Sequence, residues 1–82
     1  MGKNYKWLEE EVLTPRQLKL YNFLKSYKED KNYMPSFKEI KEHMNLKSKS
    51  SVYTMIGHLE YKGYIKRLPY KARALEIIKE YK

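Results

Sequence analysis

A short segment near the middle of the chain combines hydroxyl and lysine side chains at the start of an expected helix. Lys47 and Lys49 alternate with small hydroxyls, and two larger hydroxyl side chains follow. Such groups at a helix start can bond to phosphate oxygens or to the edges of nucleic acid bases. We predict base or groove contacts from five residues, which are Ser48, Ser50, Ser51, Tyr53 and Thr54. The two lysines are expected to contact phosphates rather than bases.

A second set of cations surrounds an expected turn near the end of the chain. Cations in such places can bind nucleic acid phosphates or reach the minor groove. We predict DNA backbone contacts from six residues, which are Lys47, Lys49, Lys66, Arg67, Lys71 and Arg73. The alternative for both sets is an ordinary solvated surface, since lysines also keep small proteins in solution.

Positive charge is concentrated in the second part of the chain. The 82 residues carry 18 Lys and Arg against 10 Asp and Glu, a net charge of +8. Residues 1–46 hold nine basic and seven acidic side chains, a net charge of +2, whereas residues 47–82 hold nine and three, a net charge of +6. An anionic partner is therefore expected to bind the C-terminal part.

The composition argues against several kinds of site. Cysteine is absent, which excludes disulfides and thiolate metal ligands. His43 and His58 have no carboxylates at ligand spacing, so we expect neither a metal nor another cofactor. No Ser/His/acid set and no Gly-rich phosphate loop is recognisable, and we expect no enzymatic activity. Without a membrane-spanning run or a signal peptide, the expected location is the cytoplasm, with no membrane partner.

Three capped segments are expected to form the helices that position these residues. Thr14-Pro15-Arg16-Gln17 and Ser36-Phe37-Lys38-Glu39 are capping boxes, and Ser48 can cap a third helix. Apolar residues at spacings of three and four follow each start. The expected helices run from residue 14 to about 31, from 36 to 44 and from 48 to 62.

The chain after Gly63 is expected to form a hairpin. Residues 64–68 and 73–78 alternate between apolar and polar side chains, and residues 69–72 can turn. Such a hairpin must pack on the helices to be stable. Three helices and a two-stranded β-hairpin wing define a winged helix-turn-helix, a mainly helical α+β fold. In this motif the third helix enters the DNA major groove. We assign residues 13–82 to this DNA-binding domain.

Residues 1–12 are an N-terminal arm whose role the sequence leaves open. Trp7, Leu8 and Val12 make the arm too apolar for a disordered tail. One small domain buries little surface on DNA, so a homodimer on paired half-sites is expected. The arm around Trp7 could form that dimer, or it could fold back over its own core.

Four short motifs occur in order between residues 13 and 65. They are Leu13-Thr14-Pro15-Arg16-Gln17, Met34-Pro35-Ser36 with Glu39-Ile40, Leu46-Lys47-Ser48, and Leu59-Glu60-Tyr61-Lys62-Gly63-Tyr64-Ile65. Together they resemble the N-terminal DNA-binding domain of LexA-type repressors, over about residues 13–78. The resemblance implies a repressor of transcription that binds double-stranded DNA. It also implies that the base-reading positions are the five hydroxyl residues named above, and that Arg16, at the start of the first helix, is a seventh contact with the DNA backbone.

Two differences from the family pattern limit what the resemblance implies. LexA-type repressors continue into a domain that cleaves itself with a Ser–Lys pair, and we expect no self-cleavage unless this sequence is a fragment of a longer protein. The usual Pro, Asn and acidic residues of the third helix are also replaced, by Lys49, Ser50, Tyr53 and Thr54. The family's usual operator is therefore not expected.

The sequence thus predicts a sequence-specific transcriptional regulator, a repressor that acts by occluding a promoter. Two alternatives remain open. Winged helices also serve as protein-interaction modules, here an anti-repressor or an assembly factor, and a basic domain can bind nucleic acid without sequence preference. Fifteen Lys against three Arg indicate an AT-rich genome, that of a low-GC bacterium, a phage or another mobile element.

Overall fold

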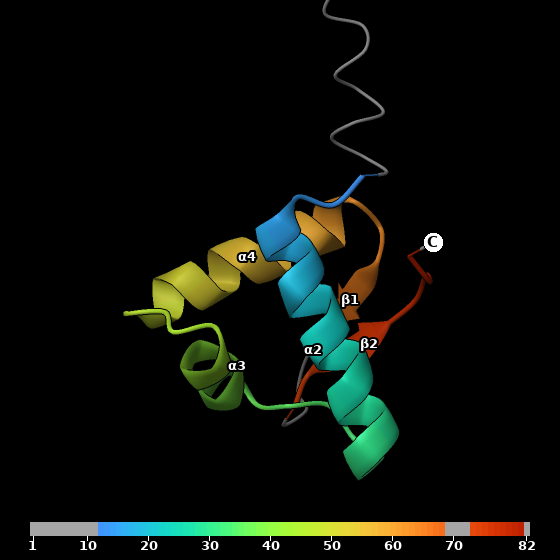
Figure 1. The fold of residues 1–82 in the computed structure, drawn as a ribbon, viewed down its shortest axis with the longest axis horizontal. Helices are drawn as coiled ribbons and strands as arrows, with labels where there is room; N and C mark the ends of the chain where they lie inside the picture. Colours follow the sequence, from blue (N-terminus) through green and yellow to red (C-terminus); the bar gives the residue numbers. More distant parts are fainter. Residues whose placement is uncertain (1–11, 69–72, 82) are drawn as a thin grey trace, which may run out of the picture.

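The computed structural model describes residues 12–68 and 73–81 as three helices and a two-stranded hairpin (Figure 1). The elements are α2 (Pro15–Lys31), α3 (Phe37–His43), α4 (Lys49–Tyr61), β1 (Ile65–Arg67) and β2 (Leu75–Ile77). This order confirms the predicted winged helix-turn-helix. The arm before Val12, with Trp7, and the predicted contact Lys71 lie outside the described residues.

Side-chain caps begin these helices as the sequence predicts. Thr14 Oγ1 accepts from Gln17 N at 3.2 Å, and Gln17 Oε1 accepts from Thr14 N at 3.1 Å. Ser36 and Glu39 form the same capping box at the start of α3. Ser48 caps α4 by accepting a backbone N–H from its first turn. Each cap satisfies a helix N–H that otherwise has no intrahelical partner.

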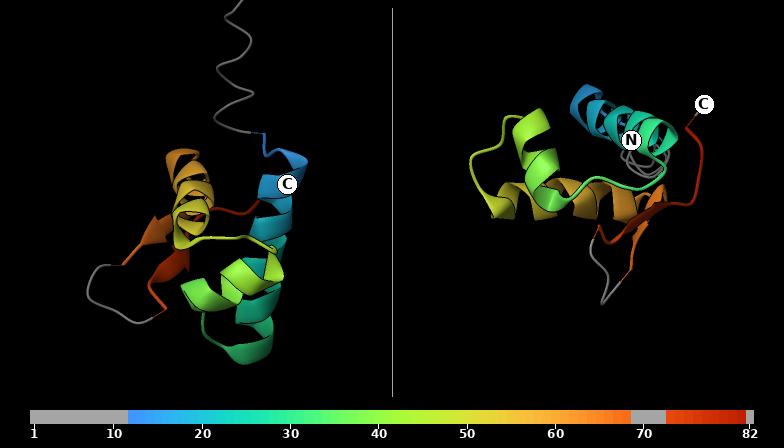
Figure 2. Two further views of the ribbon diagram at one scale, coloured as in Figure 1. Left: turned by 90° about the vertical axis from the view of Figure 1, so that its left-hand side faces the viewer. Right: turned by 90° about the horizontal axis from the view of Figure 1, so that it is seen from below.

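Left-handed backbone conformations follow the three helices. Asn32 has a φ of 68°, Asn45 a φ of 56° and Gly63 a φ of 84°. Asparagine and glycine are among the residues that adopt this region most readily, and both commonly follow a helix end. Asn45 lies in the short turn that sends α4 across α3 (Figure 2).

The core lies between the helices and one face of the hairpin. Leu20 and Leu24 of α2, Ile40 of α3 and Ile56 of α4 are fully buried. Helix α2 crosses α4, while α3 and the hairpin lie on either side of this pair (Figure 2). The buried face of α4 therefore orients its opposite face towards solvent.

The hairpin is antiparallel and short. Ile65 pairs with Ile77 and Arg67 with Leu75, and Leu68 N donates to Ala74 O at 2.9 Å beyond the ladder. Each strand has three residues, fewer than the alternating segments 64–68 and 73–78 predicted. Two strands of this length are not stable alone, so contacts with the helices must hold them.

Candidate nucleic-acid interface

Helix α4 has two contrasting faces. Val52, Ile56 and Leu59 are fully buried, whereas Tyr53 and Thr54 are exposed. Buried positions recur at the spacing of one helix face, so the residues between them face solvent. Tyr53 and Thr54, on the exposed face, are two of the residues that the sequence predicts to contact bases.

A shallow hollow joins the exposed face of α4 to the start of α2. Ser50, Ser51 and Thr54 line this hollow together with Arg16, and Leu46 and Met55 contribute apolar atoms. The sequence predicted Arg16 and the α4 hydroxyls as separate contacts. The fold brings them onto one surface, where a single ligand can meet the cation and the hydroxyls.

The hydroxyls of α4 differ in their own hydrogen bonds. Ser48 Oγ accepts from Ser51 N at 3.3 Å and lies 3.3 Å from Ser51 Oγ. Thr54 Oγ1 donates to the backbone oxygen of Ser50 at 3.0 Å, which leaves its lone pairs to accept a bond. The Ser50 hydroxyl makes no hydrogen bond within residues 12–68 and 73–81, so it can both donate and accept.

Tyr53 lies apart from that hollow and is held from two sides. Its ring meets Phe37 of α3 edge-on with centroids 5.0 Å apart, and the Arg67 guanidinium lies 5.6 Å from the ring centroid. The side chain is still 45% exposed. The sequence did not predict that Phe37 packs against Tyr53, because its local pattern indicated only the capped start of α3.

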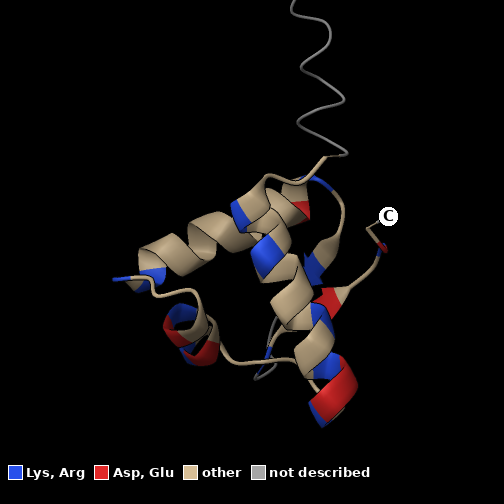
Figure 3. Cartoon of the chain, viewed as in Figure 1, with Lys and Arg blue, Asp and Glu red and all other residues tan. Residues whose placement is uncertain are grey.

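Three predicted phosphate contacts carry no ion pair within the described part of the chain. Lys47, Lys49 and Lys66 are exposed, and no carboxylate occurs between His43 and Leu59 in the sequence. Figure 3 shows basic residues at the start of α4 with no acidic residue on that part of the helix. The charges of Lys47 and Lys49 are therefore free to attract an anion, whereas Lys66 lies opposite Glu76 in the hairpin without forming an ion pair within the described residues.

Arg67 is engaged within the fold. Its Nε lies 3.0 Å from Glu60 Oε1, an ion pair that lacks the geometry of a linear hydrogen bond, and Nη2 lies 3.5 Å from Tyr53 O. Part of the guanidinium remains exposed. A phosphate would have to compete with Glu60 for this cation.

Arg73 is also engaged within the fold, and its predicted contact with the DNA backbone stays a prediction. Its Nη1 donates to Glu39 Oε1 at 2.8 Å and to Met34 O at 3.0 Å, and its guanidinium lies 4.6 Å from the Tyr33 ring centroid. The bond to Glu39 also raises the pKa of Arg73. A phosphate would have to compete with Glu39 and Met34 for Nη1, whereas Nη2 and Nε form no hydrogen bond within residues 12–68 and 73–81.

Glu39 is held in its ionised form by several donors. The backbone N–H of Ser36 contributes most, and with Arg73 and the Tyr27 hydroxyl it lowers the pKa of Glu39 from 4.5 to about 2. The Ser36 N–Glu39 Oε1 distance is 2.7 Å, and the Tyr27 Oη–Glu39 Oε2 distance is 3.0 Å. Hydrogen bonds to a carboxylate favour its charged form.

The described residues contain no group of three or more His, Asp or Glu side chains that could hold a metal ion. Within the same ranges, no helix combines the length and apolar character needed to cross a membrane.

Comparison with known proteins finds one family over most of the chain. Residues 10–74 match the family described as the LexA DNA binding domain. The LexA repressor of Novosphingobium aromaticivorans is 46% identical over 69 residues, which cover 84% of this chain and 30% of that protein. The LexA repressor of Erythrobacter litoralis is 48% identical over 69 residues, with 84% and 30% covered. That of Staphylococcus aureus strain USA300 is 46% identical over 68 residues, with 83% and 33% covered. The chain thus spans about a third of the length of these relatives.

Proposed function

Because this chain belongs to the LexA DNA-binding domain family, we propose that it represses transcription by occupying operator DNA and occluding the promoter. The observation that supports this proposal best is the exposed face of α4. Its hydroxyls and the lysines at its start belong to a stretch of sequence without carboxylates, and Ser50, Ser51 and Thr54 line a hollow together with Arg16 of α2. The family is one of regulators rather than catalysts, and a regulator of DNA acts where the DNA is. We accordingly place this protein in the cytoplasm of a prokaryote.

In the proposed complex, α4 enters the major groove of double-stranded DNA. Base edges are read by the hydroxyl residues, which are Ser48, Ser50, Ser51, Tyr53 and Thr54. Four cations bind the backbone around them, which are Arg16, Lys47, Lys49 and Lys66. Arg67 has at most a secondary part because Glu60 competes for it, and Arg73 is assigned a different role below.

The proposal includes a homodimer, because a single domain of this size buries only roughly 600–1,000 Å² on DNA. The arm around Trp7 is the proposed dimer contact. Val12, the last residue of the arm, is 37% exposed, and its carbonyl accepts from Lys62 Nζ at 2.7 Å. This hydrogen bond joins the end of the arm to the residue that follows α4.

Deleting residues 1–11 and measuring the mass in solution tests the arm. We expect the intact chain to dimerise and the truncated chain to be a monomer. A dimer that survives the deletion would exclude the arm as the contact.

The proposed function is tested by selecting binding sites from a random DNA duplex library at physiological salt. A repressor is expected to enrich one motif and to exceed its own non-specific affinity by about 10³ or more. Uniform binding to all duplexes would identify a non-specific binder. No DNA binding, together with capture of an acidic protein, would identify an interaction module.

A paired substitution tests which face of the molecule reads the bases. Ser50→Ala removes an exposed hydroxyl on α4, and Ser26→Ala removes an exposed hydroxyl on α2 as the control. We expect only the first to change the selected motif, because a good base contact is worth roughly 1–3 kcal/mol of discrimination. An unchanged motif for Ser50→Ala would remove this residue from the reading face.

A further inference from the structure

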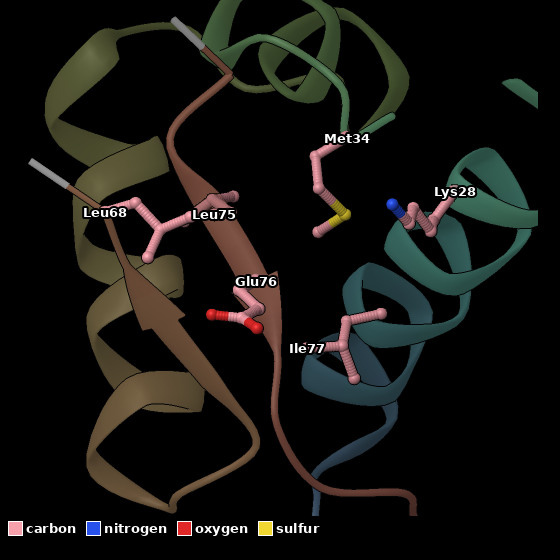
Figure 4. A pocket seen from close by; sticks show the side chains of 6 residues that line it. All are labelled: Lys28, Met34, Leu68, Leu75, Glu76 and Ile77. Carbon is pink, nitrogen blue, oxygen red and sulfur yellow. The ribbon is translucent and has the colours of Figure 1, made fainter. Parts of the chain in front are cut away.

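Both strands of the hairpin pack on the helices. Ile65 of β1 and Leu75 of β2 are buried in the core. Beside β2, a pocket is lined by Ile77 and Glu76 of the strand, by Lys28 of α2 and by Met34 of the α2–α3 turn (Figure 4). On this side of the hairpin, polar contacts with the helices can therefore add to the apolar packing.

Arg73 spans this side of the molecule. It stands two residues before β2 in a left-handed conformation with a φ of 53°, which is uncommon for arginine. From there its Nη1 reaches Met34 O at 3.0 Å, and its guanidinium lies over Tyr33 with 4.6 Å to the centroid. One side chain thus ties the beginning of β2 to the α2–α3 turn.

The carboxylate of Glu39, which accepts from Arg73, is also held by hydrogen bonds from α2 and from the start of α3. Glu39 Oε1 accepts from Ser36 N as part of the capping box of α3, and Oε2 accepts from the Tyr27 hydroxyl of α2. Arg73 Nη1 joins this carboxylate at 2.8 Å and lies 3.4 Å from Tyr27 Oη. The cluster connects α2, the turn, α3 and the segment before β2 through one carboxylate, that of Glu39.

We propose that Arg73 is a positioning residue of the wing. It holds β2 to the α2–α3 turn and so fixes the hairpin, with Lys66, relative to the exposed face of α4. The DNA part of this inference rests on the proposed function, whereas the attachment of the hairpin is a property of the free protein. Arginine suits the role because its planar guanidinium can stack on Tyr33 while its N–H groups serve two acceptors, which lysine cannot reproduce.

The first test uses the free protein and amide hydrogen exchange. In Arg73→Met we expect the amide of Leu68, which donates to Ala74 O across the hairpin, to exchange about tenfold faster. Amides in the middle of α4 should change less. The matched control is Lys28→Met. Lys28 lines the pocket beside β2, and its ammonium group forms no ion pair within the described ranges. Unchanged exchange of Leu68 in Arg73→Met overturns the proposal.

Glu39→Gln keeps the test decisive even if Arg73→Met folds poorly. Glutamine also completes a capping box, so this change preserves the cap of α3 while it removes the charge that Arg73 meets. We expect a smaller acceleration at Leu68 with the same local pattern, and little additional change in the double variant. Fully additive effects would show that the two residues act separately and would also overturn the proposal.

The second test measures the salt dependence of DNA affinity. If Arg73 positions the wing, Glu39→Gln weakens binding, and Lys66→Ala has less effect on the salt slope in the Arg73→Met background than in the wild type. If Arg73 instead contacts a phosphate, Glu39→Gln frees it and strengthens binding, and the slopes of the two variants add. A wild type with no affinity for DNA would refute the proposed function, while the exchange experiment would still decide the attachment.

Discussion

The start of α4 and the base of the hairpin are both basic in sequence, yet they use their cations differently. Lys47 and Lys49 are exposed and carry no ion pair within the described ranges. Arg67 pairs with Glu60, and Arg73 with Glu39. The difference arises because the carboxylates lie close to the hairpin and away from the start of α4. A cation near a carboxylate forms an ion pair within the fold, whereas a cation without such a neighbour remains available to a ligand.

The largest effect is expected at the start of α4. Replacing both Lys47 and Lys49 by Ala should reduce the slope of log K against log salt concentration, where K is the DNA association constant, by about 2 in magnitude. Each of the two lost phosphate contacts contributes about 0.9 to that slope. Binding should weaken similarly on all DNA sequences. Gel-shift titration at several salt concentrations measures this, and Lys31→Ala at the far end of α2 is the control. A slope equal to that of the wild type would remove the distinction between the two regions.

The next effect is expected at Lys66, the exposed cation of β1. Its replacement by Ala should lower the steepness by about 1 and leave the selected motif unchanged. This result would show that the hairpin contributes to DNA binding through a lysine, although its arginines are engaged. If the slope does not change, the wing has no phosphate contact at this position.

A smaller effect is expected for Arg67. Arg67→Met should lower the steepness by less than Lys66→Ala does, because Glu60 already occupies much of this cation. Adding Glu60→Gln should recover part of any lost affinity, since the single change leaves an unpaired carboxylate on the last turn of α4. An effect equal to that of Lys66→Ala would show that Arg67 leaves Glu60 for a phosphate.

The smallest effect is expected from protonation of Glu39, which changes the stability of the fold only at acidic pH. The pKa of Glu39 is lowered to about 2 from 4.5. The carboxylate is ionised in both folded and unfolded chains well above pH 4.5, so its contribution to stability is complete there. It is lost as the pH falls from about 4.5 towards 2. Unfolding followed by circular dichroism should show this loss, and Glu39→Gln should flatten that part of the curve. An unchanged curve would argue against the cluster.

The helices could be predicted from sequence because their signals are local. The capping boxes at Thr14 and Ser36 and the cap at Ser48 involve residues three apart, and each helix begins within one residue of its predicted start. The strands were predicted too long. Alternation continues beyond Arg67 and Ile77, whereas the observed ladder extends only from Ile65 to Arg67 in β1 and from Leu75 to Ile77 in β2.

The candidate site was predictable in part. The exposed face of α4 followed from the spacing of its buried residues, and the motifs that indicated the LexA DNA-binding domain family are confirmed by the match over residues 10–74. The sequence did not predict that Arg16 lines the same hollow as Ser50 and Thr54. Nor did it predict that Phe37 packs against Tyr53. These contacts depend on how α2, α3 and α4 cross, which no local pattern specifies.

The sequence by itself determined the elements, the excess of positive charge after residue 46 and the face of α4 that points to solvent. Caps, helical periodicity and composition depend on near neighbours, so they can be read along the chain. Only the tertiary structure decided which cations are available. Arg73 and Glu39 are 34 residues apart, and packing of the hairpin and the helices brings them to 2.8 Å. Coulomb attraction and hydrogen bonding act over such short distances in space, whatever the separation in sequence.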